Sequence, residues 1–327
     1  MKRLFLLLLS VVLSASLLAC AADPAPTEQT EPPLVGISLA GGGDELTNAL
    51  ADKLETEFPA YESGYRVAIQ CAAKDPDTQI RQIEELVALG AKCLIIEAVD
   101  SLTLSATLSK IEIPIIACDA MLMDTDKVAA CVTYDYAAIG KQMAEAVLAE
   151  TDLKKPATVE LFMGAPEHHG SILLHQGILS VLQPYFDEGK LLCKSGQLLY
   201  EDTYCVEDTD GARDTCLRRL RGTYTQRKPL NISLCATDTI ANGCRQALEK
   251  AGYTRKTWPL IASVGGSSEN KQAVADGYQL LTVEKDPLTM ARSLAEITHG
   301  VLSGGKLPKT TLHNHVKTVP TVFLIDN

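Results

Sequence analysis

The sequence predicts an α/β protein with two doubly wound parallel sheets, and three observations support this fold class. Short apolar runs alternate with amphipathic stretches from Leu34 almost to the end of the chain, and repeated βα units of this kind build parallel sheets covered by helices on both faces. The chain has 327 residues, a length typical of about two domains. Its composition, 46% hydrophobic and 22% charged, is that of an ordinary globular protein.

The alternation predicts each element in turn. Residues 34–39 form a continuous apolar run typical of a buried strand, and residues 44–57 a helix, because Leu46, Leu50 and Leu54 recur every four residues. Further strands are expected at 65–71, 93–97, 113–117, 129–133, 158–163, 191–196, 231–235, 260–264, 279–283 and 319–325. Further helices are expected at 75–89, 102–110, 137–149, 171–184, 208–220, 240–251, 269–276 and 287–302. These elements fill two open sheets, and a closed eight-fold barrel is the alternative fold.

The first 33 residues indicate a targeting signal and a tether. Lys2 and Arg3 precede an apolar run over residues 4–18, which is the pattern of a secretory signal. Residues 17–20, LLAC, look like a bacterial lipobox, so we expect cleavage after residue 19 and lipidation of Cys20. An uncleaved anchor is the alternative, but the run of about 15 residues is short for a membrane span of roughly 20. Residues 21–33 contain four prolines and no large apolar side chain, as in an extended tether.

Charge and cysteine content narrow the function classes. The net charge is -11, from 30 Lys+Arg and 41 Asp+Glu, and loss of residues 1–19 with their two basic residues makes it -13. This balance argues against a nucleic-acid binder. Ten cysteines occur without a Cys-x-x-Cys pair or a zinc spacing. Beyond Cys20 we expect mostly reduced, buried thiols, with a Cys205–Cys216 disulfide as the alternative, and neither a metal nor a cofactor.

Motifs of the common enzyme classes are missing from the sequence. Neither a Gly-x-Ser-x-Gly elbow nor a His-Glu-x-x-His zinc motif occurs. A DNA-binding regulator of similar fold would begin with a basic helix pair, where this chain has the lipobox. The sequence therefore carries no signature of these enzyme classes, and the lipobox predicts a protein held outside the cytoplasm on the cell membrane.

A long stretch resembles the type I periplasmic binding proteins, most closely those for multiple monosaccharides, xylose, glucose and galactose. It is VELFMGAPEHHGSILLHQGILSVLQPYFDEGKLLCKSGQ, residues 159–197. Supporting runs are VGIS at 35–38, QIRQIEELVALGAKCLIIEAVD at 79–100, IPIIACD at 113–119, LCATD at 234–238 and VEKD at 283–286. The resemblance covers nearly all of residues 34–325.

This resemblance implies two lobes joined by three chain crossovers that close on a ligand by a hinge motion. The first lobe would comprise residues 34–133 plus 284–309, and the second 134–283 plus 310–327. Hinges would lie near Tyr134-Asp135, near Glu284-Lys285 and at 315–319. The implied function is that of a monomeric solute-binding protein that delivers a monosaccharide to ABC permease subunits. A sensor that presents its ligand to a membrane kinase is the alternative.

Ligands of open parallel sheets bind beyond the carboxyl ends of the strands. The candidate ligand residues of the first lobe are therefore those that directly follow its strands. Gly42 and Asp44 lie in a three-glycine loop after the first strand, where the backbone can approach a ligand, although Asp44 also suits a helix N-cap. Asp100 and Asp119 match strand-end acids of the resembled family that accept hydrogen bonds from sugar hydroxyls. A capping or turn role is the alternative for both.

Further candidates follow later strands. Glu167, His168 and His169 occupy the loop after residues 158–163, where a solvated loop is the alternative. Asp238 matches a family Asp or Asn, with an N-cap role as the alternative. The resemblance implies backbone contacts from Gly266 and a donor role for Lys285.

Two departures from the family pattern indicate a changed ligand. Ala120 stands where the family has an Arg, which removes a bidentate donor, and aromatic residues are only 5% of the chain. Tyr134, Tyr200 and Tyr204 are the remaining candidates for stacking on a sugar ring. A polyol, a cationic metabolite attracted by the acidic cleft or a nucleoside is the alternative to a monosaccharide.

Overall fold

The computed structural model describes residues 31–62, 64–165, 168–225, 227–305, 307, 315–319 and 322–325. From Pro33 onward these residues form one compact unit that contains two six-stranded sheets. We call the part of the unit built on each sheet the first and the second lobe.

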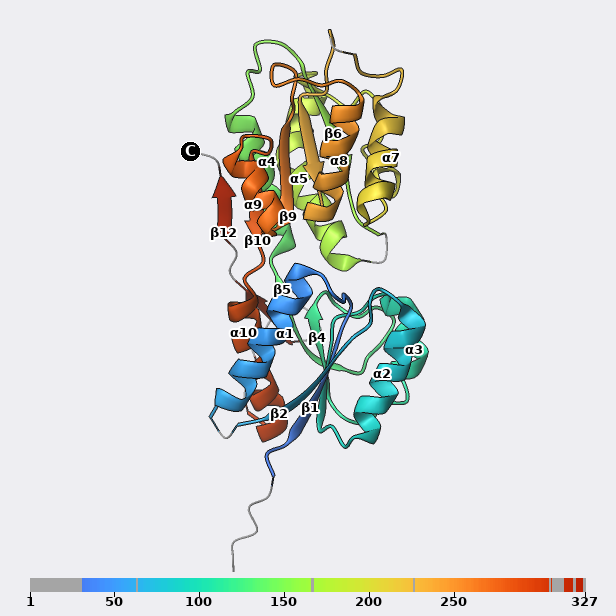
Figure 1. Cartoon of the computed structure of the whole chain (residues 1–327), viewed down its shortest axis with the longest axis vertical. Helices are drawn as coiled ribbons and strands as arrows, with labels where there is room; N and C mark the ends of the chain where they lie inside the picture. The colour runs from blue at the N-terminus through green and yellow to red at the C-terminus, as the bar shows by residue number, and fades with distance from the viewer. Residues whose placement is uncertain are drawn as a thin grey trace, which may run out of the picture. The chain divides into compact units, whose positions relative to one another are not determined.

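The first lobe is an entirely parallel sheet between two pairs of helices (Figure 1). Helices α2 (Pro76–Ala88) and α3 (Ser101–Leu108) cover one face, and α1 (Glu45–Ala60) and α10 (Pro287–Ser303) the other. In spatial order the strands are β11 (His315–Val319), β5 (Val128–Tyr134), β4 (Ile115–Asp119), β3 (Cys93–Ile96), β1 (Leu34–Leu39) and β2 (Arg66–Cys71).

The second lobe repeats this layout with one antiparallel edge. Its strands are, in spatial order, β12 (Val322–Ile325), β10 (Leu281–Glu284), β9 (Leu260–Gly265), β8 (Ile232–Cys235), β6 (Ala157–Phe162) and β7 (Leu191–Leu192). Only the β10–β12 pair is antiparallel among the described pairs. The helices are α4 (Tyr136–Ala149), α5 (His169–Asp187), α6 (Tyr200–Thr203), α7 (Thr209–Leu220), α8 (Asp238–Lys250) and α9 (Ser268–Ala275).

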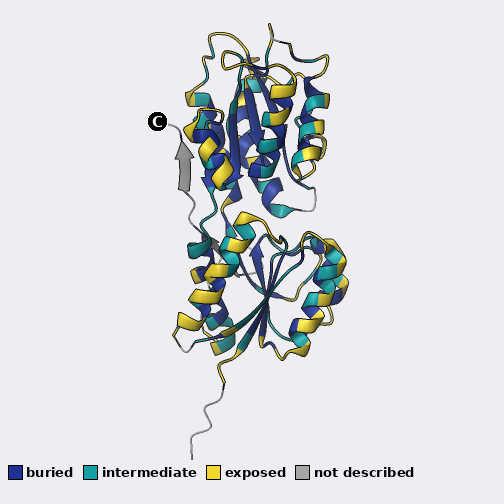
Figure 2. Ribbon diagram, viewed as in Figure 1, coloured by how far each residue is buried: buried dark blue, intermediate teal, exposed yellow. Residues whose placement is uncertain are grey.

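Both sheets lie at the centre of their lobes, as the dark strands of Figure 2 show. Every residue of β3 and of β6 is buried, because helices cover both faces of each sheet. This explains why the strands appear in the sequence as continuous apolar runs rather than as alternating patterns. The two-sheet prediction is confirmed, and the eight-fold barrel alternative is wrong.

Sheet membership corrects the prediction for the end of the chain. The single strand expected at 319–325 is two short strands, β11 in the first sheet and β12 in the second. Residues 315–319 therefore extend the first sheet, although the sequence assigned everything after residue 309 to the second lobe. The chain also changes sheets after Tyr134 and after Glu284, where the sequence placed the first two crossovers.

The described helices include none that is long and apolar enough to cross a membrane. All nine described cysteines are free thiols, so the alternative Cys205–Cys216 disulfide is not formed. Seven of them are buried, as expected, and Cys71 and Cys193 are partly exposed.

Candidate functional site

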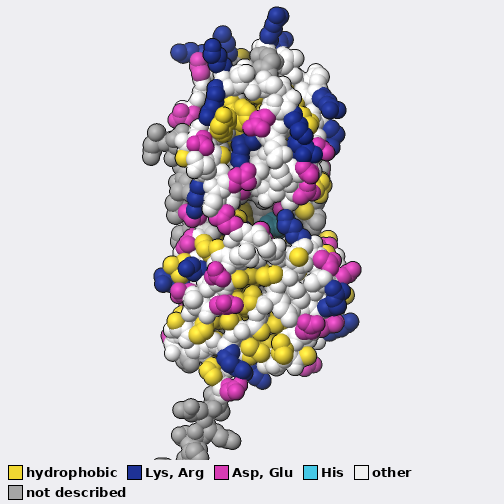
Figure 3. Space-filling model, viewed as in Figure 1, with side chains coloured by type: hydrophobic (Ala, Val, Ile, Leu, Met, Phe, Trp, Pro, Cys, Tyr) yellow, Lys and Arg dark blue, Asp and Glu magenta, His cyan; other side chains and the backbone are white. Residues whose placement is uncertain are grey.

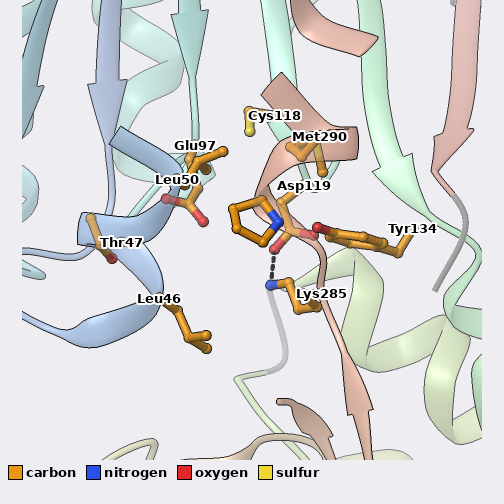
Figure 4. Close-up of a pocket in the computed structure, with 10 residues that line it drawn as sticks. Leu46, Thr47, Leu50, Glu97, Cys118, Asp119, Tyr134, Lys285 and Met290 are labelled. Atoms are coloured by element: carbon orange, nitrogen blue, oxygen red, sulfur yellow. Dashed lines mark hydrogen bonds and ion pairs between the residues drawn. The ribbon is translucent and has the colours of Figure 1, made fainter. Parts of the chain in front are cut away.

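A small pocket opens at the carboxyl ends of the first-lobe strands (Figure 4). Its volume is about 60 Å³, room for only a few water molecules. Acidic, basic, aromatic and aliphatic side chains from both ends of the chain line it, namely Leu46, Thr47, Leu50, Glu97, Cys118, Asp119, Tyr134, Lys285, Pro287 and Met290.

Asp119 is the last residue of β4 and is 6% exposed. Its backbone is left-handed, with φ of 67°, a conformation that costs a non-glycine residue of order 1 kcal/mol or more and clusters at functional sites. Its carboxylate accepts hydrogen bonds from Tyr136 Oη at 2.7 Å and from Lys285 Nζ at 2.6 Å. Burial alone would raise the pKa of Asp119, but the charges of Lys285 and His168 and these hydrogen bonds hold it below the ordinary value.

Lys285 follows β10, where the chain returns to the first lobe. Its ammonium is 2.6 Å from the Asp119 carboxylate and 5.5 Å from the centre of the Tyr134 ring. Burial opposes the charge of Lys285, but Asp119 and the neighbouring Tyr136 and Tyr134 keep its pKa well above the ordinary value. The pocket therefore holds a fixed ion pair.

Glu97 directly follows β3 and adds a second carboxylate. Its Oε2 accepts a hydrogen bond from Ala40 N at 3.1 Å, and the rest of the carboxylate faces the pocket (Figure 4). Burial, reinforced by the charge of Asp119 and partly offset by Lys285, raises the pKa of Glu97 to about 7. Such a group has acceptor capacity to spare for a ligand.

Apart from Thr47, the remaining wall is mostly apolar. Leu46 and Leu50 come from α1, Met290 from α10, and Tyr134 from the end of β5. A pocket with one apolar side and a few fixed charged groups suits a ligand that combines hydroxyl groups with a nonpolar ring face.

Two predicted residues of the first lobe cap helices and do not line the pocket. Asp44 caps α1 by accepting hydrogen bonds from Thr47 N at 2.9 Å and from Thr47 Oγ1 at 2.8 Å. Asp100 caps α3 by accepting from Leu102 N at 3.0 Å. The capping alternative is thus confirmed for both, and their contact with a ligand stays a prediction. Gly42 donates its N–H to Asp44 Oδ2.

Asp238 and Gly266 hold the second lobe together at its strand ends. Asp238 is 4% exposed and accepts hydrogen bonds from Thr282 Oγ1 at 2.7 Å, from Ser267 N at 2.7 Å and from Ser263 Oγ. The N-cap alternative for Asp238 is wrong, because Thr237 caps α8 and Asp238 is its first helical residue.

Gly266 has φ of 79°, and a Cβ there would lie 2.7 Å from Glu284 Cα. The close approach of β10 therefore excludes a side chain at this position.

His168 and His169 begin α5. His168 is the N-cap, with Nδ1 accepting from Ser171 N at 3.2 Å, and its ring contacts Tyr136 at 6.3 Å between centroids. Burial, with the neighbouring His168, lowers the pKa of His169. Glu167 lies outside the described residues, as does Cys20. Within the described ranges, no group of three or more His, Cys, Asp or Glu side chains is arranged to hold a metal ion.

Sequence reasoning missed Glu97 and Tyr136. The signal for Glu97 was available, because a charged residue directly follows the wholly apolar run Cys93–Ile96. Tyr136 carried no distinct signal, since its contact with Asp119 joins residues of separate elements.

Comparison with known proteins agrees with this geometry. Residues 35–306 match the periplasmic binding protein domain family. The chain is 28% identical over 322 residues to the multiple sugar-binding periplasmic protein SbpA of Azospirillum brasilense, covering 95% of this chain and 90% of SbpA. It is 29% identical over 274 residues to the multiple sugar-binding periplasmic receptor ChvE of Rhizobium radiobacter, covering 80% and 77%. The predicted resemblance is confirmed, and with it the prediction of a binding protein rather than an enzyme.

Solved structures confirm the fold. An ABC transporter solute-binding protein from Clostridium phytofermentans with bound β-D-glucose superposes with a TM-score of 0.81 at 26% identity, covering 90% of this chain and 94% of that one. A carbohydrate transporter solute-binding protein from Chloroflexus aurantiacus gives a TM-score of 0.81 at 20% identity, covering 90% and 93%.

Proposed function

Because the chain belongs to the periplasmic binding protein domain family, we propose that it is an extracytoplasmic solute-binding protein of an ABC importer that binds a monosaccharide. The observation that carries the proposal is the pocket at Asp119 and Lys285, a charged pair at strand ends opposite an aliphatic wall. Its carboxylate and ammonium offer acceptors and donors to sugar hydroxyls. Relatives named for multiple sugars and a neighbour with bound glucose support this substrate class.

Binding requires the two lobes to move. A pocket of about 60 Å³ on the first lobe can hold only part of a monosaccharide, so we propose that the second lobe completes the site by rotation about hinges after Tyr134 and after Glu284, and that the ligand stabilises this closed form. The closed form would then be the one presented to the permease subunits.

A thermal-shift screen of the purified protein against monosaccharides, polyols, amino acids and nucleosides tests the substrate class. A ligand that binds only the folded state adds about 2.7 kcal/mol of stability at 100 times its Kd. We expect one or a few monosaccharides to raise Tm. A rise with a nucleoside or an amino acid alone would overturn the sugar assignment, and no rise with any monosaccharide would contradict the proposal.

We further propose that Cys20 carries a lipid that holds the protein at the membrane, with residues 21–33 as the tether. Lipid chains supply membrane affinity in proportion to their buried CH₂ groups. Metabolic labelling with a radioactive fatty acid tests this. We expect the wild-type protein to be labelled and to sediment with membranes, whereas C20A should be unlabelled. Equal labelling of C20A would exclude this anchor.

A further inference from the structure

The Glu97 carboxylate is bound to the protein by a single direct hydrogen bond. Among the contacts of the described residues, only the one from Ala40 N at 3.1 Å reaches it. An ionised carboxylate accepts about four hydrogen bonds, and Glu97 is only partly buried, so its remaining acceptor sites are open to the pocket. Figure 4 shows the carboxylate of Glu97 turned toward the interior of the pocket, on the side opposite Tyr134. A molecule bound in the pocket can therefore donate hydrogen bonds to the acceptor sites that the protein leaves open.

The charges around Glu97 do not balance. The largest electrostatic effects on it come from Asp119 of β4, Lys285 after β10 and Asp44 at the start of α1. Lys285 is the single cation among them, and at 2.6 Å it is bound to Asp119. Two thiols, Cys71 of β2 and Cys118 of β4, are also within electrostatic reach, and burial raises the pKa of both. Together these groups leave the pocket with an excess of negative charge when Glu97 is ionised.

The chain lacks the arginine that the resembled family has next to this aspartate, and with it a positive charge that would balance Glu97. Ala120 follows Asp119, so the neighbouring position supplies no basic side chain. Burial, together with the charge of Asp119, raises the pKa of Glu97 to about 7, so the site favours either a proton or another positive charge beside this carboxylate.

We propose that Glu97 is a specificity-determining residue that selects sugars carrying a protonated amino group over neutral sugars of the same shape. The proposal rests on the proposed function, since it concerns the ligand of the same pocket. An ammonium group beside Glu97 would supply both the missing donors and the missing charge, whereas a hydroxyl group would supply a donor alone. Hydrogen bonds between charged partners are about twice as strong as neutral ones.

The test is a calorimetric titration of the purified protein at pH 7.5 with three pairs of ligands: D-glucosamine and D-glucose, D-galactosamine and D-galactose, and D-mannosamine and D-mannose. In at least one pair we expect the amino sugar to bind ten- to a hundredfold more tightly than its parent. Glu97→Gln should remove this preference, so that an amino sugar and its neutral parent bind the variant with Kd values within about threefold of each other. The exposed Glu112 offers a matched control, and E112Q should retain the full preference.

A second titration at pH 5.5 separates a ligand contact from a merely structural role. Protonation of Glu97 should reduce the preference for the amino sugar in the wild type, and in E97Q the preference should stay absent at both pH values. If E97Q fails to fold, the wild-type titrations at the two pH values test the proposal by themselves: a preference that does not fall at pH 5.5 would overturn the role of Glu97.

Each outcome has a distinct meaning. Neutral sugars that bind as tightly as amino sugars, or a preference that persists in E97Q, would overturn the role of Glu97 and leave the proposed function intact. No binding of any sugar, neutral or amino, would overturn the proposed function together with this inference.

Discussion

Glu160 of the second lobe and Glu97 of the first are used differently, and Glu160 is the more deeply buried of the two. In the second lobe, Glu160 has no exposed surface and binds Ser195 N at 3.2 Å, Ser195 Oγ at 2.7 Å and the hydroxyl of Tyr224, with Arg219 at 3.8 Å. In the first lobe, Glu97 has one hydrogen bond and faces a pocket. A carboxylate whose acceptor sites are filled by the protein stabilises the fold, and one with vacant acceptor sites is available to a ligand.

Asp238 and Asp119 repeat this contrast at the strand ends. Asp238 binds three groups of its own lobe, from β9, β10 and the start of α9. Asp119 binds Tyr136 and Lys285, which follow the two points where the chain changes sheets. At similar strand-end positions, Asp238 therefore stabilises the second lobe, whereas Asp119 of the first lobe links the two chain crossovers.

The largest expected effect is that of Glu160→Gln. The substitution leaves the guanidinium of Arg219, which is 7% exposed, without its counter-charge, and breaking a buried pair in this way costs about 3–5 kcal/mol. We expect urea denaturation to show a loss of this size, with sugar affinity unchanged in the folded protein. A loss below about 1 kcal/mol, or a large loss of affinity, would break the comparison.

Asp238→Asn should have the next largest effect. The new amide nitrogen cannot accept the hydrogen bond from Ser267 N, which Asp238 Oδ2 accepts at 2.7 Å, so a donor is left unpaired at a cost of about 1–3 kcal/mol. The same denaturation experiment measures it. Stability equal to that of the wild type would show that the α9 terminus does not depend on this carboxylate.

Glu97→Gln should act in the opposite direction. Burial raises the pKa of Glu97 to about 7 in the folded protein, from 4.5 in the unfolded chain, so the folded state binds more protons between these values and wild-type stability falls as pH rises through them. At pH 8 the variant should be more stable than the wild type by about 1–3 kcal/mol. The gain should disappear near pH 4.5. A variant less stable than the wild type at pH 8 would contradict a pocket-facing, poorly partnered carboxylate.

The smallest expected effect is the chemical modification of exposed cysteine thiols, which can be measured separately in each lobe. Cys71 of the first lobe and Cys193 of the second are partly exposed, whereas the other seven described cysteines are buried. A thiol reagent should therefore modify these two in the native protein, and peptide mass spectrometry would locate them. Rapid modification of Cys118, beside Asp119, would show that the pocket is open in solution.

Much of the fold could be predicted from the sequence because strands covered on both faces must be apolar along their whole length. The run at Cys93–Ile96 is an example. The end of the chain could not be predicted in this way, since an apolar run indicates a strand but not the sheet it joins. The short helix α6 (Tyr200–Thr203) was also missed, because four residues show no helical periodicity.

The site was predictable only in part. Asp119 and Lys285 follow from the resemblance, and the structure brings them into one pocket. Asp44 and Asp100 occupy equally suitable strand-end positions, but an aspartate after a strand and before a helix serves capping as well as binding. Their side-chain partners decide between the two roles, and sequence spacing does not contain this information. Glu97 differs from Glu160 for the same reason.

The most direct test of the account is the Kd of one responding monosaccharide for the wild type, for Asp119→Asn and for Asp238→Asn, measured by calorimetry. Asp119→Asn keeps the shape of the pocket but removes the charge that holds Lys285, so we expect the Kd to rise by about ten- to a hundredfold. Asp238→Asn, at the corresponding strand end of the second lobe, should change the Kd by less than about threefold. An unchanged Kd in Asp119→Asn together with a large rise in Asp238→Asn would place the binding site in the other lobe and contradict the account.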